Sequence, residues 1–190
     1  MLNKGSFKAT WVKWSDLFSK EEIAQIKQLK KDNVLSRGVL AGDKENLEYR
    51  KCKVFFVSRD ESTEWIFEKL ENCIISTNRD FYNFELYPLK TFQYTSYVGD
   101  DQEFYNWHWD MHSSGELISQ RKISGVVQLT DPSEYEGGDL EMSICGSLEV
   151  VPKIQGSCNL FPTFVNHRVT KVTKGLRETI VFWVEGPDWR

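Results

Sequence analysis

The sequence predicts a mainly β domain with flanking helices, and three observations support this fold class. From residue 84 onward, apolar and polar residues alternate with period two, and glycine, proline or aspartate interrupts the alternation every few residues. Many short strands separated by turns are typical of a β-sandwich or β-barrel. Apolar residues at helical spacing occur in the first 80 residues. The 190 residues are 40% hydrophobic and 14% aromatic, which is enough for the core of one domain.

Two amphipathic helices are expected before residue 80. Ser19 and Glu22 have the spacing of a capping box, in which both side chains satisfy backbone N–H groups at a helix start. Apolar residues follow at helical spacing, so the first helix should cover residues 20–31 and a second should cover 62–78. The apolar residues that set this spacing are Ile23, Ile26 and Leu29 in the first helix and Trp65, Ile66, Leu70, Cys73 and Ile74 in the second.

The strand pattern divides one domain into supporting segments (1–83) and a strand-rich core (84–187). A strand is expected in the first part at residues 49–58. The strands expected in the core cover residues 84–87, 91–98, 105–110, 122–130, 138–144, 147–151, 157–161, 167–172 and 177–185. Turn signals at Gly137-Gly138 and Lys174-Gly175, among others, separate them.

Charge and cysteine content exclude several classes of function. A formal net charge of -4 gives little attraction for phosphate, so no nucleic-acid partner is expected. The chain has no run of 18 apolar residues and no apolar segment of a secretory signal at its N-terminus, so we expect a cytoplasmic protein without a membrane partner. Its cysteines lack metal-binding spacing and are expected to be buried free thiols, at Cys52, Cys73, Cys145 and Cys158.

His108 and Asp110 form the first part of a candidate metal site. Side chains at positions i and i+2 of an extended segment point to the same side. His167, on a distant predicted strand, would complete a set of two histidines and one carboxylate. This set leaves coordination positions open and is typical of non-haem Fe(II) oxygenases. The chain has three histidines, and the third, His112, is expected at the surface or in a supporting position.

Arg177 follows His167 by ten residues and suggests a co-substrate. Fe(II) held by three protein ligands can chelate a 2-oxo acid, whose distal carboxylate then needs a cation. The planar guanidinium binds carboxylates through two hydrogen bonds and stays charged. On the last predicted strand Arg177 shares its side with Thr179, Val181 and Trp183, so a cation, a hydroxyl and an aromatic ring would line one pocket wall.

Four stretches between Thr91 and Pro187 resemble the Fe(II)/2-oxoglutarate-dependent oxygenases, especially the prolyl 4-hydroxylase alpha-subunit-like and PKHD-type hydroxylase branch. They cover about half of the chain and occur in the family's order. The stretches are residues 105–110 (YNWHWD), 121–132 (RKISGVVQLTDP), 135–140 (YEGGDL) and 161–183, which begins with Phe-Pro and ends with Trp183.

The resemblance implies a double-stranded β-helix (jelly-roll) core, with the N-terminal helices packed on the larger sheet. It implies Fe(II) on His108, Asp110 and His167, and the distal carboxylate of 2-oxoglutarate on Arg177. O2 would be the second co-substrate, and ascorbate is a candidate reductant. Because halogenating members replace the carboxylate ligand with a small residue, Asp110 favours hydroxylation.

Three further positions are candidate contacts of the co-substrate. Tyr97 matches the family's tyrosine that lines the 2-oxoglutarate pocket, and Thr179 shares the side of Arg177. Gln128 lies where some prolyl hydroxylases have a tyrosine that helps to bind the co-substrate, and a purely structural role is equally compatible with a glutamine there. Trp109 and Trp183 fit either a wall that orients the substrate or the core of the barrel.

The expected activity is hydroxylation of an unactivated C–H bond with release of succinate and CO2. Peptidyl proline is the leading substrate, and a free amino acid or another small metabolite is the alternative, so the partner is a peptide or a small molecule. A non-catalytic jelly roll that senses a metal is a third hypothesis, which the retention of Arg177 beside the three ligands argues against. The oligomeric state stays open.

Overall fold

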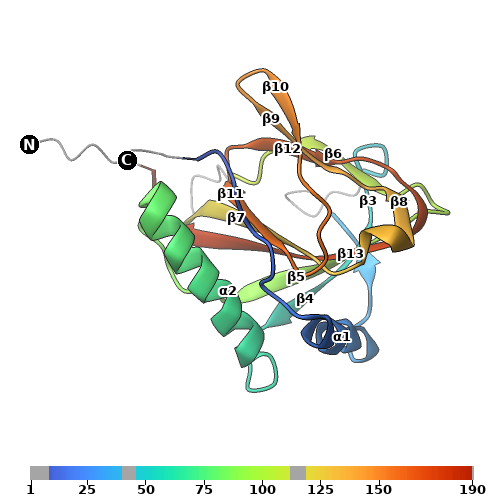
Figure 1. Cartoon of the computed structure of the whole chain (residues 1–190), viewed down its shortest axis with the longest axis horizontal. Coiled ribbons are helices and arrows are strands. Elements are labelled where there is room, and N and C mark those ends of the chain that lie inside the picture. The colour runs from blue at the N-terminus through green and yellow to red at the C-terminus, as the bar shows by residue number, and fades with distance from the viewer. Residues whose placement is uncertain (1–8, 40–45, 112–118, 190) are drawn as a thin grey trace, which may run out of the picture.

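The computed structural model describes residues 9–39, 46–111 and 119–189. These residues form two antiparallel sheets, with two α-helices outside one of them (Figure 1). The helices are α1 (Lys20–Gln28) and α2 (Glu64–Thr77), which continue as a 3-10 turn (Leu29–Lys31) and a π-helical turn (Asn78–Tyr82). The prediction for His112 falls outside the described residues.

The strands belong to two layers. In chain order they are β1 (Val12–Trp14), β2 (Ser36–Arg37), β3 (Arg50–Lys51), β4 (Lys53–Ser58), β5 (Thr91–Val98), β6 (Phe104–His108), β7 (Gln120–Gln128), β8 (Tyr135–Gly137), β9 (Leu140–Ile144), β10 (Ser147–Val150), β11 (Cys158–Pro162), β12 (Asn166–Val169) and β13 (Val172–Gly186). A short 3-10 turn, Pro132–Glu134, precedes β8.

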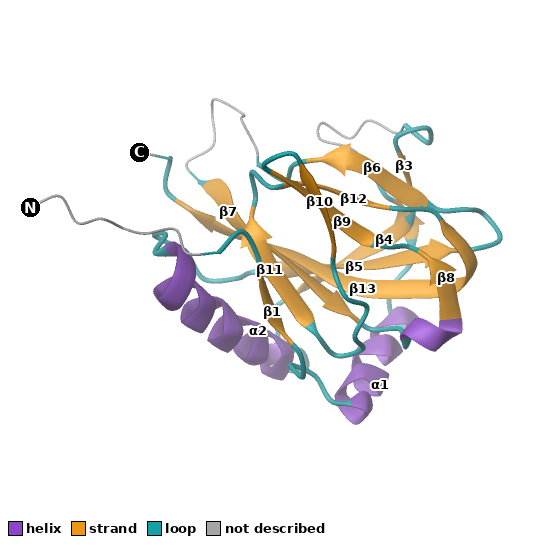
Figure 2. Cartoon of the chain, turned by 45° about the horizontal axis from the view of Figure 1, so that its top comes forward, coloured by secondary structure: helices purple, strands orange, loops and turns teal. Residues whose placement is uncertain are grey.

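The larger sheet has the strand order β1-β11-β7-β13-β5-β4-β2, with β8 paired to β13. The smaller sheet has the order β10-β9-β12-β6-β3 and lies over one face of the larger (Figure 2). Both helices lie on the opposite face of the larger sheet. The predicted jelly roll with N-terminal helices on its larger sheet is therefore confirmed. The division between supporting and core segments is not sharp, because β1, β2 and β4 extend the larger sheet and β3 extends the smaller one.

The two faces of β13 contact different parts of the protein. Ile180, Phe182 and Val184 are fully or almost fully buried in the cluster that also contains the apolar faces of both helices. Thr179 and Trp183 point the other way, into the space between the sheets. Because side chains alternate along a strand, one 15-residue segment supplies both the main core and an interior wall.

The first helix begins where the sequence predicts. The Ser19 hydroxyl accepts a hydrogen bond from the backbone N–H of Glu22 (3.2 Å), and the Glu22 carboxylate accepts one from the N–H of Ser19 (2.8 Å). The second helix begins at Glu64, two residues later than predicted, because the Asp60 carboxylate accepts hydrogen bonds from the N–H groups of residues 62 and 63 and holds them in a turn.

An ion pair joins the first helical segment to β13. Glu178 is 2% exposed and accepts contacts from Lys30 (2.5 Å) and Lys27 (3.4 Å). Both lysines are only partly buried, so water screens this pair and its contribution to stability is modest. The position of this ion pair matters more than its strength. It holds the helix-facing side of β13 in place at Glu178, the residue next to Arg177.

Several predicted boundaries are wrong for identifiable reasons. Residues 84–87 form no strand: Tyr87 donates one backbone hydrogen bond to Glu185, and Phe84 packs on Trp189. The chain does not turn at Lys174-Gly175, because β13 continues through this point: Gly175, at φ +72°, pairs with Tyr135 of β8, and the register shift of this pairing lies before Lys174. Strands β1, β2 and β8 were not predicted, since two or three residues are too few to show an alternation.

Three of the four cysteines have the predicted burial. Cys52, Cys73 and Cys158 are buried free thiols as expected, but Cys145 is exposed. It lies in the tight turn between β9 and β10, at φ +50°. No helix within the described ranges combines the length and apolarity needed to cross a bilayer.

The core between α2 and the larger sheet gives a stability prediction. Phe67 is fully buried and its ring lies 5.3 Å from that of Phe92. Phe67→Ala should lower the free energy of unfolding by about 3–5 kcal/mol, because it leaves a cavity in a packed core. Ile75→Ala on the same helix, where the side chain is 61% exposed, is the control and should cost far less. Urea unfolding followed by circular dichroism tests this, and equal effects of both substitutions would contradict the packing described.

Candidate active site

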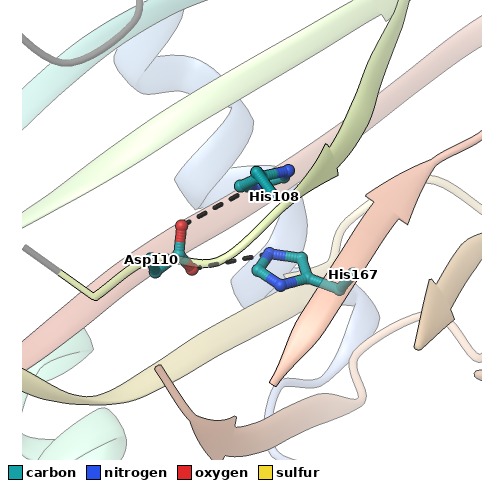
Figure 3. Close-up of side chains that lie close together, drawn as sticks. All are labelled: His108, Asp110 and His167. Atoms are coloured by element: carbon teal, nitrogen blue, oxygen red, sulfur yellow. Dashed lines mark ion pairs between the residues drawn. The ribbon is translucent and has the colours of Figure 1, made fainter. Parts of the chain in front are cut away.

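His108, Asp110 and His167 lie together between the two sheets (Figure 3). Nε2 of His108 is 3.6 Å from one carboxylate oxygen of Asp110, and Nε2 of His167 is 3.5 Å from the other. His108 ends β6, and His167 is its partner in the register of β12. In the described part of the chain this is the one group of three such residues whose ligand atoms converge, all within 4.8 Å of one another.

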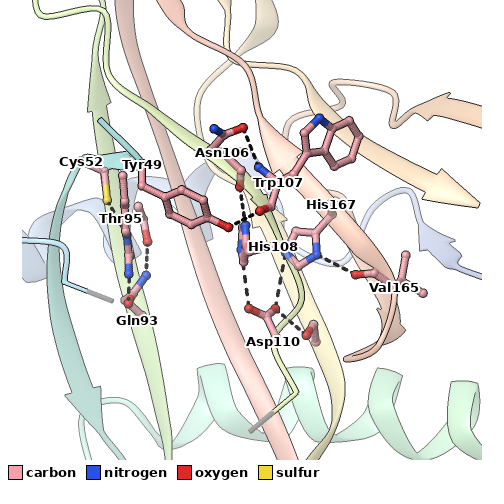
Figure 4. A network of polar contacts seen from close by, with 12 residues as sticks. Tyr49, Cys52, Gln93, Thr95, Asn106, Trp107, His108, Asp110, Val165 and His167 are labelled. Carbon is pink, nitrogen blue, oxygen red and sulfur yellow. Dashed lines mark hydrogen bonds and ion pairs between the residues drawn. The ribbon is translucent and has the colours of Figure 1, made fainter. Parts of the chain in front are cut away.

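A backbone carbonyl two residues earlier in the chain orients each of the two imidazoles. Nδ1 of His108 lies 2.7 Å from the carbonyl oxygen of Asn106, and Nδ1 of His167 lies 2.9 Å from that of Val165 (Figure 4). A carbonyl can only accept, so Nδ1 carries the hydrogen in both rings and each Nε2 lone pair is left for a ligand. A second contact of this kind is usual for histidines that bind metals.

Asp110 reaches the site in a different way from the one predicted. It lies two residues beyond the end of β6, so the expected strand over 105–110 is too long. The larger sheet holds it: its N–H donates to the carbonyl of Thr163 (2.9 Å), and the Ser124 hydroxyl donates to its carboxylate (2.7 Å). The prediction that the His108 and Asp110 side chains lie on one side is nevertheless correct.

The protonation states suit a cation. Burial, reinforced by the neighbouring His167, lowers the pKa of His108, so this imidazole is neutral. Burial alone would raise the pKa of Asp110, but the two imidazoles and the Ser124 hydroxyl outweigh it, and the pKa is lowered. Two imidazole nitrogens and one carboxylate, with no hydrogen bond closing them off from one another, fit the donor set of a non-haem Fe(II) site.

These ligands line a cavity of about 400 Å³. Four residues of β13 form one wall, as their shared side predicts: Arg177, Thr179, Val181 and Trp183. Trp183 therefore belongs to the wall and not to the core. Trp109 also lines the cavity, but it is 62% exposed and lies at the mouth.

The buried side chain of Arg177 has the features of a carboxylate-binding group. It is 2% exposed, has no carboxylate partner in the described residues, and its Nε makes no hydrogen bond. The nearby Thr179 hydroxyl is also buried and unpaired. Buried polar groups without partners are costly, so both atoms fit an incoming acceptor such as the distal carboxylate of 2-oxoglutarate. Tyr97 is opposite Arg177 in the register, and its ring centre lies 5.3 Å from the guanidinium.

Gly138 leaves the space that Arg177 occupies. A Cβ at this position would lie 2.7 Å from Cδ of Arg177, and the residue adopts φ +63°. The sequence indicated only that Gly137-Gly138 gives a turn its backbone freedom. The structure adds a packing reason, because any larger residue here would push the arginine side chain away.

Residues 92–185 match the family model described as the 2OG-Fe(II) oxygenase superfamily. The chain belongs to this superfamily. Within the superfamily, a PKHD-type hydroxylase from Pseudoalteromonas atlantica is 28% identical over 182 residues, which cover 90% of this chain and 75% of the relative. A PKHD-type hydroxylase from Acidovorax ebreus is 38% identical over 63 residues, or 33% of this chain. That match spans only 28% of the relative's length.

A solved structure shows the superfamily fold over nearly the whole chain. A Trichoplax adhaerens prolyl hydroxylase, in complex with a peptide fragment of the hypoxia inducible factor oxygen degradation domain, superimposes with a TM-score of 0.76 at 17% identity. The superposition covers 92% of this chain and 83% of the other. These findings confirm the resemblance to the PKHD-type and prolyl 4-hydroxylase-like branch.

Gln128 has a less direct position in this superfamily member than the sequence suggested. It lies on the inner face of β7, opposite Thr179. Its amide donates to the Tyr135 hydroxyl (2.7 Å), and it lines a small neighbouring cavity that Arg177 also borders. Tyr135 therefore lies between Gln128 and Arg177, and any influence of Gln128 on a co-substrate would pass through the Tyr135 ring.

Sequence reasoning missed three contacts of the candidate site. Ser124 has no role in the sequence analysis, although its hydroxyl holds Asp110. Tyr105, which belongs to the first stretch that carries the family resemblance, stacks on the His108 ring with centres 3.5 Å apart. Arg50 and Arg121 line the cavity beside Arg177. The alternation along β7 could have pointed to Ser124, but Arg50 lies in a two-residue strand outside the matched stretches, where no sequence signal marks it.

The Ser124 contact gives a prediction for metal binding by this superfamily member. Ser124→Ala should weaken metal affinity by about 10- to 100-fold, because a hydrogen bond that orients a ligating carboxylate is lost. Ser147→Ala, on the exposed strand β10, is the matched control. Titration of the metal-free protein with Co(II), followed by absorbance, measures the affinity. Equal affinities of the wild type and Ser124→Ala would show that the serine does not position Asp110.

Proposed function

We propose that this protein is an Fe(II)- and 2-oxoglutarate-dependent dioxygenase that hydroxylates an unactivated C–H bond and releases succinate and CO2. The observation that carries the proposal is the joint position of four buried side chains. His108, Asp110 and His167 converge at one point of a cavity, and Arg177 lines the same cavity with no carboxylate partner among the described residues. The intact set also argues against a metal sensor without turnover, which would have no use for Arg177.

Each residue of this set has a defined role in the proposal. His108, Asp110 and His167 hold Fe(II) and leave positions open for co-substrates. When bound, Fe(II) with 2-oxoglutarate and O2 supplies the oxidising chemistry of C–H hydroxylation, and ascorbate would serve as the reductant that restores Fe(II). The retained carboxylate of Asp110 favours hydroxylation over halogenation.

The far end of the cavity would hold the tail of 2-oxoglutarate. Arg177 binds its distal carboxylate, and the Thr179 hydroxyl offers a further donor. Burial raises the pKa of Tyr97, so this ring stays a neutral phenol and adds no negative charge that would repel the co-substrate. Gln128 would support the arrangement through Tyr135.

The primary substrate would enter past an exposed apolar mouth. Phe56, Trp109 and Met111 line the cavity and are 58%, 62% and 37% exposed. We propose a prolyl residue of a peptide as the leading substrate, because a structure with the same fold was solved with a peptide and the mouth is open. A one-oxygen mass gain in a proline-containing peptide, but not in free proline, would support this choice. The reverse result would favour a small metabolite.

The proposed activity has a direct test. Addition of Fe(II) and 2-oxoglutarate without oxygen should give the visible charge-transfer band of the chelate, and admission of O2 should then give slow succinate formation even without substrate. Folded protein that shows neither the band nor succinate would refute the oxygenase proposal. Protein treated with a metal chelator is the control and should give no band.

Two substitutions separate metal binding from co-substrate binding. His108→Ala should abolish both the band and succinate formation, because it removes a metal ligand. Arg177→Gln should chiefly raise the 2-oxoglutarate concentration needed for half-saturation, by about 10- to 100-fold, since it removes one charge-assisted contact and leaves the metal ligands in place. Arg79→Gln, an exposed arginine outside the cavity, is the matched control. An unchanged 2-oxoglutarate requirement in Arg177→Gln would refute the role of this arginine.

A further inference from the structure

The cavity contains more positive charge than the proposed reaction uses. Its described lining has three guanidinium groups, on Arg50, Arg121 and Arg177, and one carboxylate, on Asp110. In the proposed function Asp110 binds the metal ion, and 2-oxoglutarate takes up Arg177 and part of the metal charge. Arg50 and Arg121 are left without an anion.

Arg50 is a buried cation whose partners are all neutral. It is 8% exposed, and its guanidinium donates to the Val39 carbonyl (2.7 Å), the Cys52 sulfur (3.1 Å) and the Gln93 side chain (3.4 Å). Within the described residues no carboxylate lies at ion-pair distance from it. A buried charge without a counter-charge is costly, and neutral acceptors offset only part of that cost.

Arg121 lies at the start of β7 and also has no ion pair in the part of the chain that is described. Its guanidinium lies 4.0 Å from the centre of the Trp183 ring. At three other sites in this protein, charged side chains contact a partner of opposite charge. Glu178 contacts two lysines, Arg59 contacts Glu64 and Glu71, and Arg168 contacts Glu141. The two cavity arginines depart from this pattern.

Each of the two arginines contacts an aromatic ring that lies next to the candidate metal ligands. Arg50 lies 4.6 Å from the centre of the Tyr105 ring, and that ring also stacks on the His108 ring with centres 3.5 Å apart. Arg121 lies over Trp183, which is opposite Ser124, the residue that holds Asp110. Stacking on a ring face fixes the plane of a guanidinium and leaves N–H groups at its edge for an incoming acceptor.

We propose, on the basis of the proposed function, that the primary substrate carries a carboxylate or a similar anionic group that Arg50 and Arg121 bind. The anion neutralises the unused charge of the cavity, and its position beside the two rings fixes which C–H bond lies near the metal ion. A free carboxylic acid and an acidic residue close to the target in a peptide would both supply this chemistry.

Binding without turnover tests the proposal. Protein loaded with Zn(II) and 2-oxoglutarate is titrated by calorimetry with two matched pairs of probes. The first pair is N-acetyl-L-proline and N-acetyl-L-prolinamide, and the second is the blocked tripeptides Glu-Pro-Glu and Gln-Pro-Gln. At least one acid should bind about tenfold tighter than its neutral match. Preference within the first pair indicates a free acid as substrate, and preference within the second alone indicates an acidic peptide.

Substitutions assign the preference to the two arginines. Arg50→Gln and Arg121→Gln should each remove most of the tenfold difference, whereas Arg50→Lys, which keeps the charge, should retain part of it. Lys51→Gln is the matched control, because Lys51 is the next residue of β3, contacts Asp101 and does not line the cavity. Arg121 is less buried than Arg50, so its substitution remains informative if Arg50→Gln does not fold.

Three outcomes would overturn the inference: no acid binds more tightly than its neutral match, the preference survives in both glutamine variants, or Arg50→Gln raises the 2-oxoglutarate requirement as much as Arg177→Gln does. The last would place Arg50 in the co-substrate site. Failure of the proposed function is distinguishable, because it is the absence of the Fe(II)–2-oxoglutarate band and does not depend on these probes.

Discussion

The register of β13 against β5 and β7 determines both the core and the cavity, because the two functions alternate along one strand. Glu178, Ile180 and Phe182 face the helices, while Arg177 and Thr179 face the space between the sheets. A shift of one residue would exchange these faces, placing Leu176 or Glu178 where the cation belongs and turning the arginine toward the helices. The apolar side of β13 makes that exchange very unfavourable. The same hydrophobic packing that stabilises the fold therefore holds Arg177 opposite Tyr97.

The candidate metal site adds a second constraint, since it draws on both sheets. The smaller sheet supplies the imidazoles of His108 and His167 from adjacent strands, and the larger sheet holds Asp110 through Thr163 and Ser124. Each proposed ligand is thus fixed by hydrogen bonds to other groups of the protein. This preorganisation keeps the donor atoms together and leaves the cavity side of the set open, as oxygenase chemistry requires.

Sequence patterns predicted the structure correctly where they were long or chemically unusual. Strand β5 has the predicted bounds because eight residues show its character, and the spacing of His108, Asp110, His167 and Arg177 predicts their place in one cavity. They failed where the decisive contact is made by another part of the chain. Gly175 is typical of a turn but lies within β13, because it pairs with Tyr135 of β8. Arg50 gave no signal, because its burial depends on neighbours from β5, β6 and the segment before β3.

In the proposed function, the distribution of the ligands over both sheets would also link the iron supply to the lifetime of the protein. An ion that binds the folded chain and not the unfolded one adds RT ln(1 + [M]/Kd) to the free energy of unfolding, which is about 2.7 kcal/mol at a hundredfold excess over Kd. An iron-starved cell would hold this chain in a form that opens more often and is degraded sooner. Scarcity of the metal would then lower the amount of the protein as well as its turnover, and the loss would persist until new chains were made.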